Sequence, residues 1–133
     1  YHTPGHTQGH VIFHFYKDKL LFTGDTLFSL GCGRIFEGTY DQMFKSLNLI
    51  KNFPKDTLIY FGHEYTLNNS KFCIHHDPKN RELEDKIIEI SEKLKNNIST
   101  TPTLLKDELN CNVFLKCENL NSFSKLRELK DNF

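Results

Sequence analysis

Apolar residues form short runs in the first half of the chain and recur at helical spacing in the second half. Val, Ile, Phe and Leu are frequent in residues 10–15 and 19–22, and the polar stretch 16–18 separates these two runs. This pattern predicts two strands joined as a hairpin. The compact apolar run 57–61, which ends at a glycine, predicts another strand.

One helix is expected between these strands. Thr39 and Gln42 have the spacing of a capping box, in which a hydroxyl and an amide satisfy free N–H groups at the start of a helix. Phe44, Leu47 and Ile50 follow at helical spacing, and Pro54 ends the pattern.

The second half of the chain predicts three further helices. The first starts near Asp77 and Pro78, with an apolar stripe and two exposed charge pairs at i,i+4 spacing; the stripe is Leu83, Ile87, Ile90 and Leu94, and the pairs are Glu82/Lys86 and Glu89/Lys93. A shorter helix is expected over residues 104–109, after the break at Pro102, and a last one over 123–130.

This organisation predicts a mixed α/β region over residues 1–67 and a mainly helical region over 68–133. The glycine-rich stretch GCGRIFEGT is too irregular for a core element, and we expect it to be a loop.

The composition is ordinary for a folded protein, and it narrows the classes of partner. The chain has 133 residues, 38% hydrophobic and 26% charged, with 17 basic and 17 acidic residues. This balance gives no overall field toward nucleic acid or an anionic membrane, so we expect neither as a partner. No apolar run approaches the roughly 20 residues of a membrane helix. The four cysteines form no CxxC pair, which is typical of unpaired thiols in a reducing compartment such as the cytoplasm.

His6, Asp25 and His63 are candidate metal ligands. Each lies in a loop or just after a predicted strand, where a rigid scaffold can direct side chains to one point. Imidazole and carboxylate are donors for zinc, iron and manganese, and a carboxylate can bridge two ions through its two oxygens. The pattern alone leaves open that each is a polar residue satisfied by backbone in a turn.

Whole motifs carry a family resemblance. TPGHTQGH, FTGDTLF, GCGR and GHEYTLNN occur in this order, and the chain ends in RELKDNF. In these motifs the chain resembles the glyoxalase II family, the hydroxyacylglutathione hydrolases of the metallo-β-lactamase fold. The resemblance implies the second half of an αββα sandwich, followed by an α-helical glutathione-binding region.

Carried over by motif, the resemblance makes His6 a ligand of one metal ion, Asp25 the bridging catalytic carboxylate and His63 a ligand of the second ion. The cofactors implied are two divalent ions, zinc first, with iron or manganese as alternatives. His10 is expected to support the site by a hydrogen bond, and His2 to be exposed and idle.

One family motif does not occur. The motif Thr-His-x-His-x-Asp-His is absent, and the chain starts at Tyr1 without Met. The sequence His75-His76-Asp77 has the wrong spacing, and we expect these residues on the surface. Two ligands for each ion are fewer than the three of a usual catalytic zinc. We therefore expect a C-terminal part of the enzyme that binds metal weakly and hydrolyses little by itself.

The reaction implied is hydrolysis of the thioester S-D-lactoylglutathione to D-lactate and glutathione by a dinuclear metal-activated hydroxide. Substrate-binding residues implied are Arg34, Tyr65, Arg127 and Lys130, the last two on one face of the final helix. A covalent mechanism through Cys32 lacks a basic partner. We expect a monomer acting on a small molecule.

Phe36 departs from the family pattern, which often has tyrosine there, so one hydroxyl contact to substrate is lost. Two alternatives remain at this point. A persulfide dioxygenase with one iron has similar motifs, but Ile35-Phe36-Glu37, the His-Glu-Tyr motif and the helical tail favour glyoxalase II. A non-catalytic fragment that binds partners through an uncovered sheet face is the other.

Overall fold

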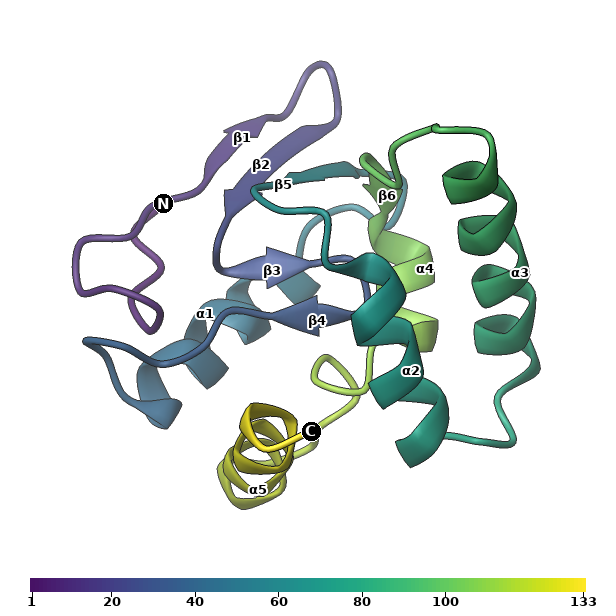
Figure 1. Cartoon of the computed structure of the whole chain (residues 1–133). Helices are drawn as coiled ribbons and strands as arrows, with labels where there is room; N and C mark the ends of the chain where they lie inside the picture. Colours follow the sequence, from purple (N-terminus) through teal and green to yellow (C-terminus); the bar gives the residue numbers. More distant parts are fainter.

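The computed structural model describes all residues 1–133 and contains a four-stranded sheet, a small two-stranded sheet and five helices (Figure 1). The strands are β1 (Phe13–Phe15), β2 (Leu20–Gly24), β3 (Leu27–Phe28), β4 (Gly31–Cys32), β5 (Leu58–Phe61) and β6 (Thr103–Leu104). The helices are α1 (Tyr40–Lys51), α2 (Thr66–His76), α3 (Arg81–Lys95), α4 (Leu105–Cys111) and α5 (Leu120–Asp131).

The larger sheet has the order β1-β2-β5-β6, and β2 and β5 are parallel while both outer pairs are antiparallel. Since β2 and β5 run in the same direction, their C-terminal ends meet at one edge of the sheet. Asp25 follows β2 and His63 lies two residues after β5. The topology therefore brings these two side chains together.

One face of this sheet is buried against helices. Leu21 of β2 and Ile59 of β5 are fully buried in one apolar cluster with Met43, Leu47 and Ile50 of α1. The Thr39 hydroxyl oxygen accepts from the Gln42 N–H at 3.2 Å, and the Gln42 side-chain oxygen accepts from the Thr39 N–H at 3.0 Å. The expected capping box is therefore confirmed.

The opposite face of the sheet is open and aromatic. Phe13, Phe15 and Phe22 are 61%, 52% and 40% exposed, and Phe22 stacks on Tyr60 with ring centroids 5.1 Å apart. A sheet with one face in water usually alternates apolar and polar residues along its strands, whereas this mixed sheet carries apolar residues on both faces. The sheet therefore has the composition of one covered on both sides, as in a sandwich.

The helical second half is folded onto the first. Strand β6 completes the sheet edge beside β5, and α5 packs beside α1 (Figure 1). Helix α3 buries Leu83 and Ile90, with Ile87 and Leu94 partly buried, so its predicted stripe is confirmed. The division of the chain at residue 67 stays a prediction.

Several local predictions were wrong. Helix α2 was missed because its inward face is partly polar: Thr66, Asn69 and Ser70 are buried beside Phe72 and Cys73. Helix α3 begins at Arg81, after the N-cap Asn80, and not at Asp77. Of the two charge pairs, Glu89–Lys93 forms at 2.6 Å, but Glu82 instead accepts a hydrogen bond from Asn110.

The glycine-rich stretch is also more ordered than predicted. Residues 31–32 form β4, which pairs with β3 in a hairpin over Leu27–Cys32, and every residue of this hairpin is buried. We call it the β3–β4 hairpin. It connects Asp25 to the loop that begins at Gly33.

Candidate functional site

His6 and His63 lie on opposite oxygens of the Asp25 carboxylate. The His6 Nε2 is 3.4 Å from Asp25 Oδ2, and the His63 Nε2 is 3.3 Å from Asp25 Oδ1. These distances exceed an ordinary N–H···O hydrogen bond. They match the separation of about 3.4 Å between two donors bound to one tetrahedral zinc at about 2.1 Å each. The sequence-predicted ligands are therefore brought together with bridging geometry.

These three side chains do not surround a single point. No group of three or more His, Cys, Asp and Glu side chains is arranged to hold one metal ion. The arrangement instead offers two positions, each with one imidazole nitrogen and one carboxylate oxygen. This donor set fits a shared dinuclear centre in which this chain supplies part of each ion's ligands.

The orientation of His6 is fixed by backbone. Its Nδ1 is 2.9 Å from the carbonyl oxygen of Arg34. A carbonyl can only accept, so Nδ1 carries the proton and, in the neutral ring, Nε2 presents its lone pair toward Asp25. Metal-binding histidines are commonly oriented by such a bond from the second ring nitrogen.

Two glycines allow the close approach around Asp25. A Cβ at Gly62 would lie 2.7 Å from Asp25 Oδ1, and one at Gly33 would lie 2.0 Å from the Asp25 carbonyl oxygen. Any side chain at these positions would displace the carboxylate or its backbone. The glycines of the GHEY and GCGR motifs are therefore required by their close packing against Asp25.

His10 supports Asp25 through a hydrogen bond, as expected. The Asp25 N–H donates to His10 Nε2 at 3.1 Å, and His10 Nδ1 is 2.9 Å from the Thr26 hydroxyl. Burial lowers the pKa of His10, and His6 lowers it further, although the Asp25 carboxylate opposes both. His10 is thus a neutral acceptor. His2 is exposed, as expected, and its Nε2 lies 2.6 Å from the Gln8 carbonyl oxygen.

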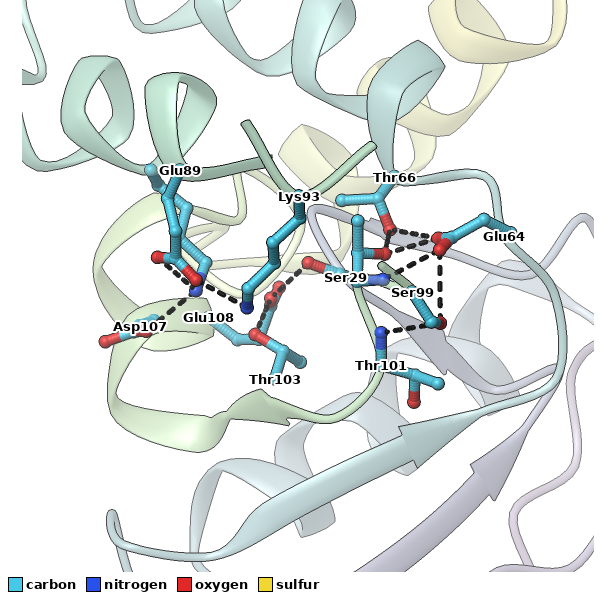
Figure 2. Close-up of polar contacts among 12 residues, drawn as sticks. Ser29, Glu64, Thr66, Glu89, Lys93, Ser99, Thr101, Thr103, Asp107 and Glu108 are labelled. Carbon is cyan, nitrogen blue, oxygen red and sulfur yellow. Dashed lines mark hydrogen bonds and ion pairs between the residues drawn. The ribbon is translucent and has the colours of Figure 1, made fainter. Parts of the chain in front are cut away.

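Glu64 of the GHEY motif is a structural residue. It accepts hydrogen bonds from the Thr100 N–H at 2.7 Å, from the Ser99 hydroxyl at 3.2 Å and from the Thr66 hydroxyl at 3.3 Å (Figure 2). Burial opposes ionisation of Glu64, but these bonds outweigh it and lower its pKa. The motif is thereby tied to the segment that precedes β6.

All seven sequence-predicted site residues line one cavity. Its volume is about 530 Å³. Its walls are His6, Asp25, Phe28, Cys32, Gly33, Arg34, Phe36, His63, Tyr65, Asn68, Asn69, Arg127, Lys130 and Asp131. The candidate metal ligands and the candidate substrate-binding residues therefore face the same space.

Aromatic rings of the cavity wall pack against the two candidate histidine ligands. Tyr65 lies parallel to His63 with ring centroids 5.1 Å apart, and its edge contacts Phe28 at 5.3 Å. Phe36, 68% exposed, meets the His6 ring edge-on at 5.0 Å. Each candidate imidazole ligand thus has an aromatic ring beside it.

The two cations of α5 that line the cavity, Arg127 and Lys130, have different surroundings, which the sequence does not show. Arg127 is 3% exposed, and it donates from Nη1 to the Cys32 carbonyl and from Nη2 to Asp131 Oδ1, both at 2.8 Å. Lys130 has no carboxylate within salt-bridge distance, and its Nζ lies 5.7 Å above the Phe72 ring. Burial, and then Arg127, lower the pKa of Lys130.

Asp131 is a site residue that the sequence analysis missed. Its Oδ1 accepts from Arg34 Nε at 3.2 Å as well as from Arg127 Nη2. The signal was present, since Asp131 lies one helical turn after Arg127, on the same face. Asp131 links the loop after β4 to the last helix.

Cys32 lines the cavity without being reactive. Burial raises the pKa of its thiol to about 11, despite the neighbouring Arg127. The thiol is therefore protonated at neutral pH and is a poor nucleophile, in agreement with the rejection of a covalent mechanism. All four cysteines are free and buried.

The chain matches known protein families over its full length. Residues 64–133 match the family described as hydroxyacylglutathione hydrolase C-terminus, and residues 1–63 match the metallo-β-lactamase superfamily. A hydroxyacylglutathione hydrolase of Pelagibacter ubique is 59% identical over 133 residues, which are 100% of this chain and 56% of the relative. The chain thus spans about half the length of the curated relatives it matches.

Solved structures show the same fold. The structure of ETHE1 from Myxococcus xanthus has a TM-score of 0.63 and 25% identity, covering 95% of this chain and 42% of that one. The structure of TTHA1623 in a di-iron-bound form has a TM-score of 0.56 and 24% identity, covering 86% and 40%. With the motifs, the ligand geometry and the family matches in agreement, the chain belongs to the hydroxyacylglutathione hydrolase family and has the metallo-β-lactamase fold.

Proposed function

We propose that this chain supplies half of a dinuclear metal site and most of the substrate cavity of a glyoxalase II, which hydrolyses S-D-lactoylglutathione to D-lactate and glutathione. One observation carries the proposal: His6 and His63 flank the two oxygens of Asp25 at 3.4 and 3.3 Å, on the wall of a cavity that also holds free cationic and aromatic groups. Family membership gives the reaction class.

Activation of the attacking water is assigned to the metal ions, because no side chain in the cavity is placed as a nucleophile. A pair of divalent cations, when bound, lowers the pKa of a water toward neutrality and polarises the thioester carbonyl. Asp25, the proposed catalytic residue, would hold both ions through its carboxylate, and His6 and His63 would each contribute an imidazole nitrogen. The remaining ligands are expected from a Thr-His-x-His-x-Asp-His segment upstream of Tyr1.

The cavity suits the charges of glutathione, which carries two carboxylates and one ammonium group. Lys130 and the Nη atoms of Arg34 have no carboxylate partner in the protein and can bind a carboxylate. Arg127 is buried and already engaged by Asp131, so Asp131 partly compensates its charge and competes with a substrate carboxylate for it. The Tyr65 hydroxyl can donate to a peptide carbonyl, and Phe36 supplies an apolar contact where a tyrosine would donate.

Further features of the proposal concern the setting of the enzyme. Zinc is the proposed metal, since imidazole and carboxylate both bind it well. We further propose a monomer in the cytoplasm, divided into residues 1–67 and 68–133. No helix of the structure is both long and apolar enough to cross a membrane.

The test is made on the protein extended upstream of Tyr1 to the length of its relatives, called here the upstream-extended protein. Metal content and S-D-lactoylglutathione hydrolysis are measured on wild type and on Asp25→Ala. We expect about two metal ions per chain and activity in the wild type, and loss of turnover in Asp25→Ala. Full activity in a metal-free preparation would contradict the proposal.

A further inference from the structure

The β3–β4 hairpin is held from outside by side chains of three helices. Backbone carbonyls of the hairpin accept hydrogen bonds at each residue from 29 to 32; the pairs are Ser29 O with Asn69 at 3.1 Å, Leu30 O with Cys73 at 3.1 Å, Gly31 O with Asn112 at 3.1 Å and Cys32 O with Arg127 at 2.8 Å. These donors come from α2, the C-terminus of α4 and α5. The helical half therefore fixes the backbone of a buried loop in the other half.

Glu108 of α4 is the centre of these contacts. It is fully buried, and its Oε2 accepts from the Leu30 N–H at 2.8 Å and from Asn112 at 3.0 Å. Its Oε1 accepts from the Ser29 hydroxyl at 2.9 Å and from the Thr103 hydroxyl at 2.8 Å (Figure 2). No cation pairs with it. Since an unpaired buried carboxylate is costly, four donors arranged around it indicate a specific role.

One end of the hairpin adjoins Asp25, and the other adjoins the backbone carbonyl that orients His6. Asp25 lies two residues before Leu27, and the Arg34 carbonyl that orients His6 lies two residues after Cys32. The ends are joined directly as well, because the Gly33 N–H donates to the Thr26 carbonyl at 3.2 Å. A shift of the hairpin would therefore move both the bridging carboxylate and the group that orients one imidazole.

From this connection we propose that Glu108 is a positioning residue for the metal centre: by holding Ser29 and Leu30 it fixes the spacing of Asp25 and His6, and thereby the metal affinity. The inference rests on the proposed dinuclear site. Glu108 does not line the cavity, so it acts on metal affinity and leaves the affinity for substrate at saturating metal unchanged.

Comparing Glu108→Ala with Glu108→Gln separates the loss of the hydrogen bonds to the hairpin from the loss of the charge. Alanine leaves the Leu30 N–H without an acceptor and removes one of the acceptors of the Asn112 amide, which keeps the Gly31 carbonyl. Glutamine keeps a carbonyl oxygen for them, and its amide can donate to the hydroxyl oxygens of Ser29 and Thr103. Ile90→Ala is the matched control, because Ile90 is a buried residue of α3, a helix that supplies none of the hydrogen bonds to the hairpin, and its truncation destabilises the fold.

The measurement is the zinc affinity of the folded upstream-extended protein, by competition with a chromophoric chelator, together with amide hydrogen exchange over residues 24–34. We expect Glu108→Ala to weaken zinc binding about 10-fold or more and to speed exchange in this segment, since residues that orient ligands are worth about 10- to 100-fold. We expect Glu108→Gln and Ile90→Ala to stay within about 3-fold of wild type, and saturating zinc to restore KM in Glu108→Ala.

Wild-type zinc affinity in Glu108→Ala, or an equal loss in Ile90→Ala, overturns the inference. If Glu108→Ala does not fold, Ser29→Ala replaces it: this change removes the hairpin's own hydroxyl donor, and unchanged zinc affinity there overturns the inference too. If the wild type itself binds no zinc, the proposed function fails with it, whereas a zinc-binding wild type with an unaffected Glu108→Ala refutes the inference alone.

Discussion

Arg127 and Lys130 lie three residues apart on α5, but the structure predicts that their removal has different consequences. Arg127→Ala removes two charged hydrogen bonds of 2.8 Å, to Cys32 O and Asp131 Oδ1, and the contact of the guanidinium with the Phe114 ring at 5.1 Å. Each such bond is worth about 1.5–3 kcal/mol. The buried Arg127 Nε has no partner, and its removal recovers part of this. We expect a net loss of about 3 kcal/mol in the free energy of unfolding.

Lys130→Ala removes no hydrogen bond within the protein, so its effect on stability should stay within about 1 kcal/mol. Lys130→Ala should instead weaken substrate binding, because it removes one charge-assisted contact worth about 1.5–3 kcal/mol. We expect KM to rise about 10- to 100-fold with little change in kcat.

Urea unfolding followed by circular dichroism gives the first quantity, and steady-state hydrolysis of S-D-lactoylglutathione by the upstream-extended protein gives the second. Lys125→Ala is the control, because Lys125 is an exposed lysine on the same helix; it should change neither. Equal destabilisation by Arg127→Ala and Lys130→Ala would refute the reasoning, as would a stable Arg127→Ala whose only defect is in KM.

Two further predictions concern the metal ligands and the buried carboxylate. Gly62→Ala should weaken zinc binding about 10-fold or more, because its Cβ would lie 2.7 Å from Asp25 Oδ1, whereas Gly9→Ala, with nothing within 4 Å, should bind zinc as wild type does in the same chelator competition. Burial raises the pKa of Glu108 above its ordinary 4.5, so the folded state holds this proton more tightly than the unfolded state. The free energy of unfolding should therefore fall as pH rises above 4.5 through the folded pKa, and this decline should be missing in Glu108→Gln; a constant difference between the two proteins in urea titrations from pH 4 to 7 would contradict this.

The features that could be predicted from the sequence are those with local causes. The capping box of Thr39 and Gln42 joins residues three apart, and the stripe of α3 follows from helical periodicity. The candidate ligands His6, Asp25 and His63 could be selected because each stands in a recognisable motif, and the structure places their side chains next to one another. The parallel strands β2 and β5 bring Asp25 and His63 together at one edge of the sheet, whereas His6 reaches them from the loop before β1.

What could not be predicted depends on contacts between distant residues. Arg127 is buried against the Cys32 carbonyl, which lies 95 residues away in sequence. The pattern around Arg127 therefore gives no sign of its burial. Helix α2 was missed because Asn69 faces inward to bind the Ser29 carbonyl, so a polar residue occupies a position where periodicity expects an apolar one. Strands β3 and β4 have two residues each, too few to show a pattern.

The hydrogen bonds from the helices to the β3–β4 hairpin limit which parts of the protein can be exchanged with those of a relative. Asn69, Cys73, Asn112 and Arg127 lie 40 to 95 residues after the carbonyl groups that they bind, yet each holds the hairpin beside Asp25. A recombinant that exchanges the tail for one of different specificity would discard these donors and loosen the loop. The tail is therefore not a detachable module, and grafting a new one requires transplanting its inward-facing polar residues as a set.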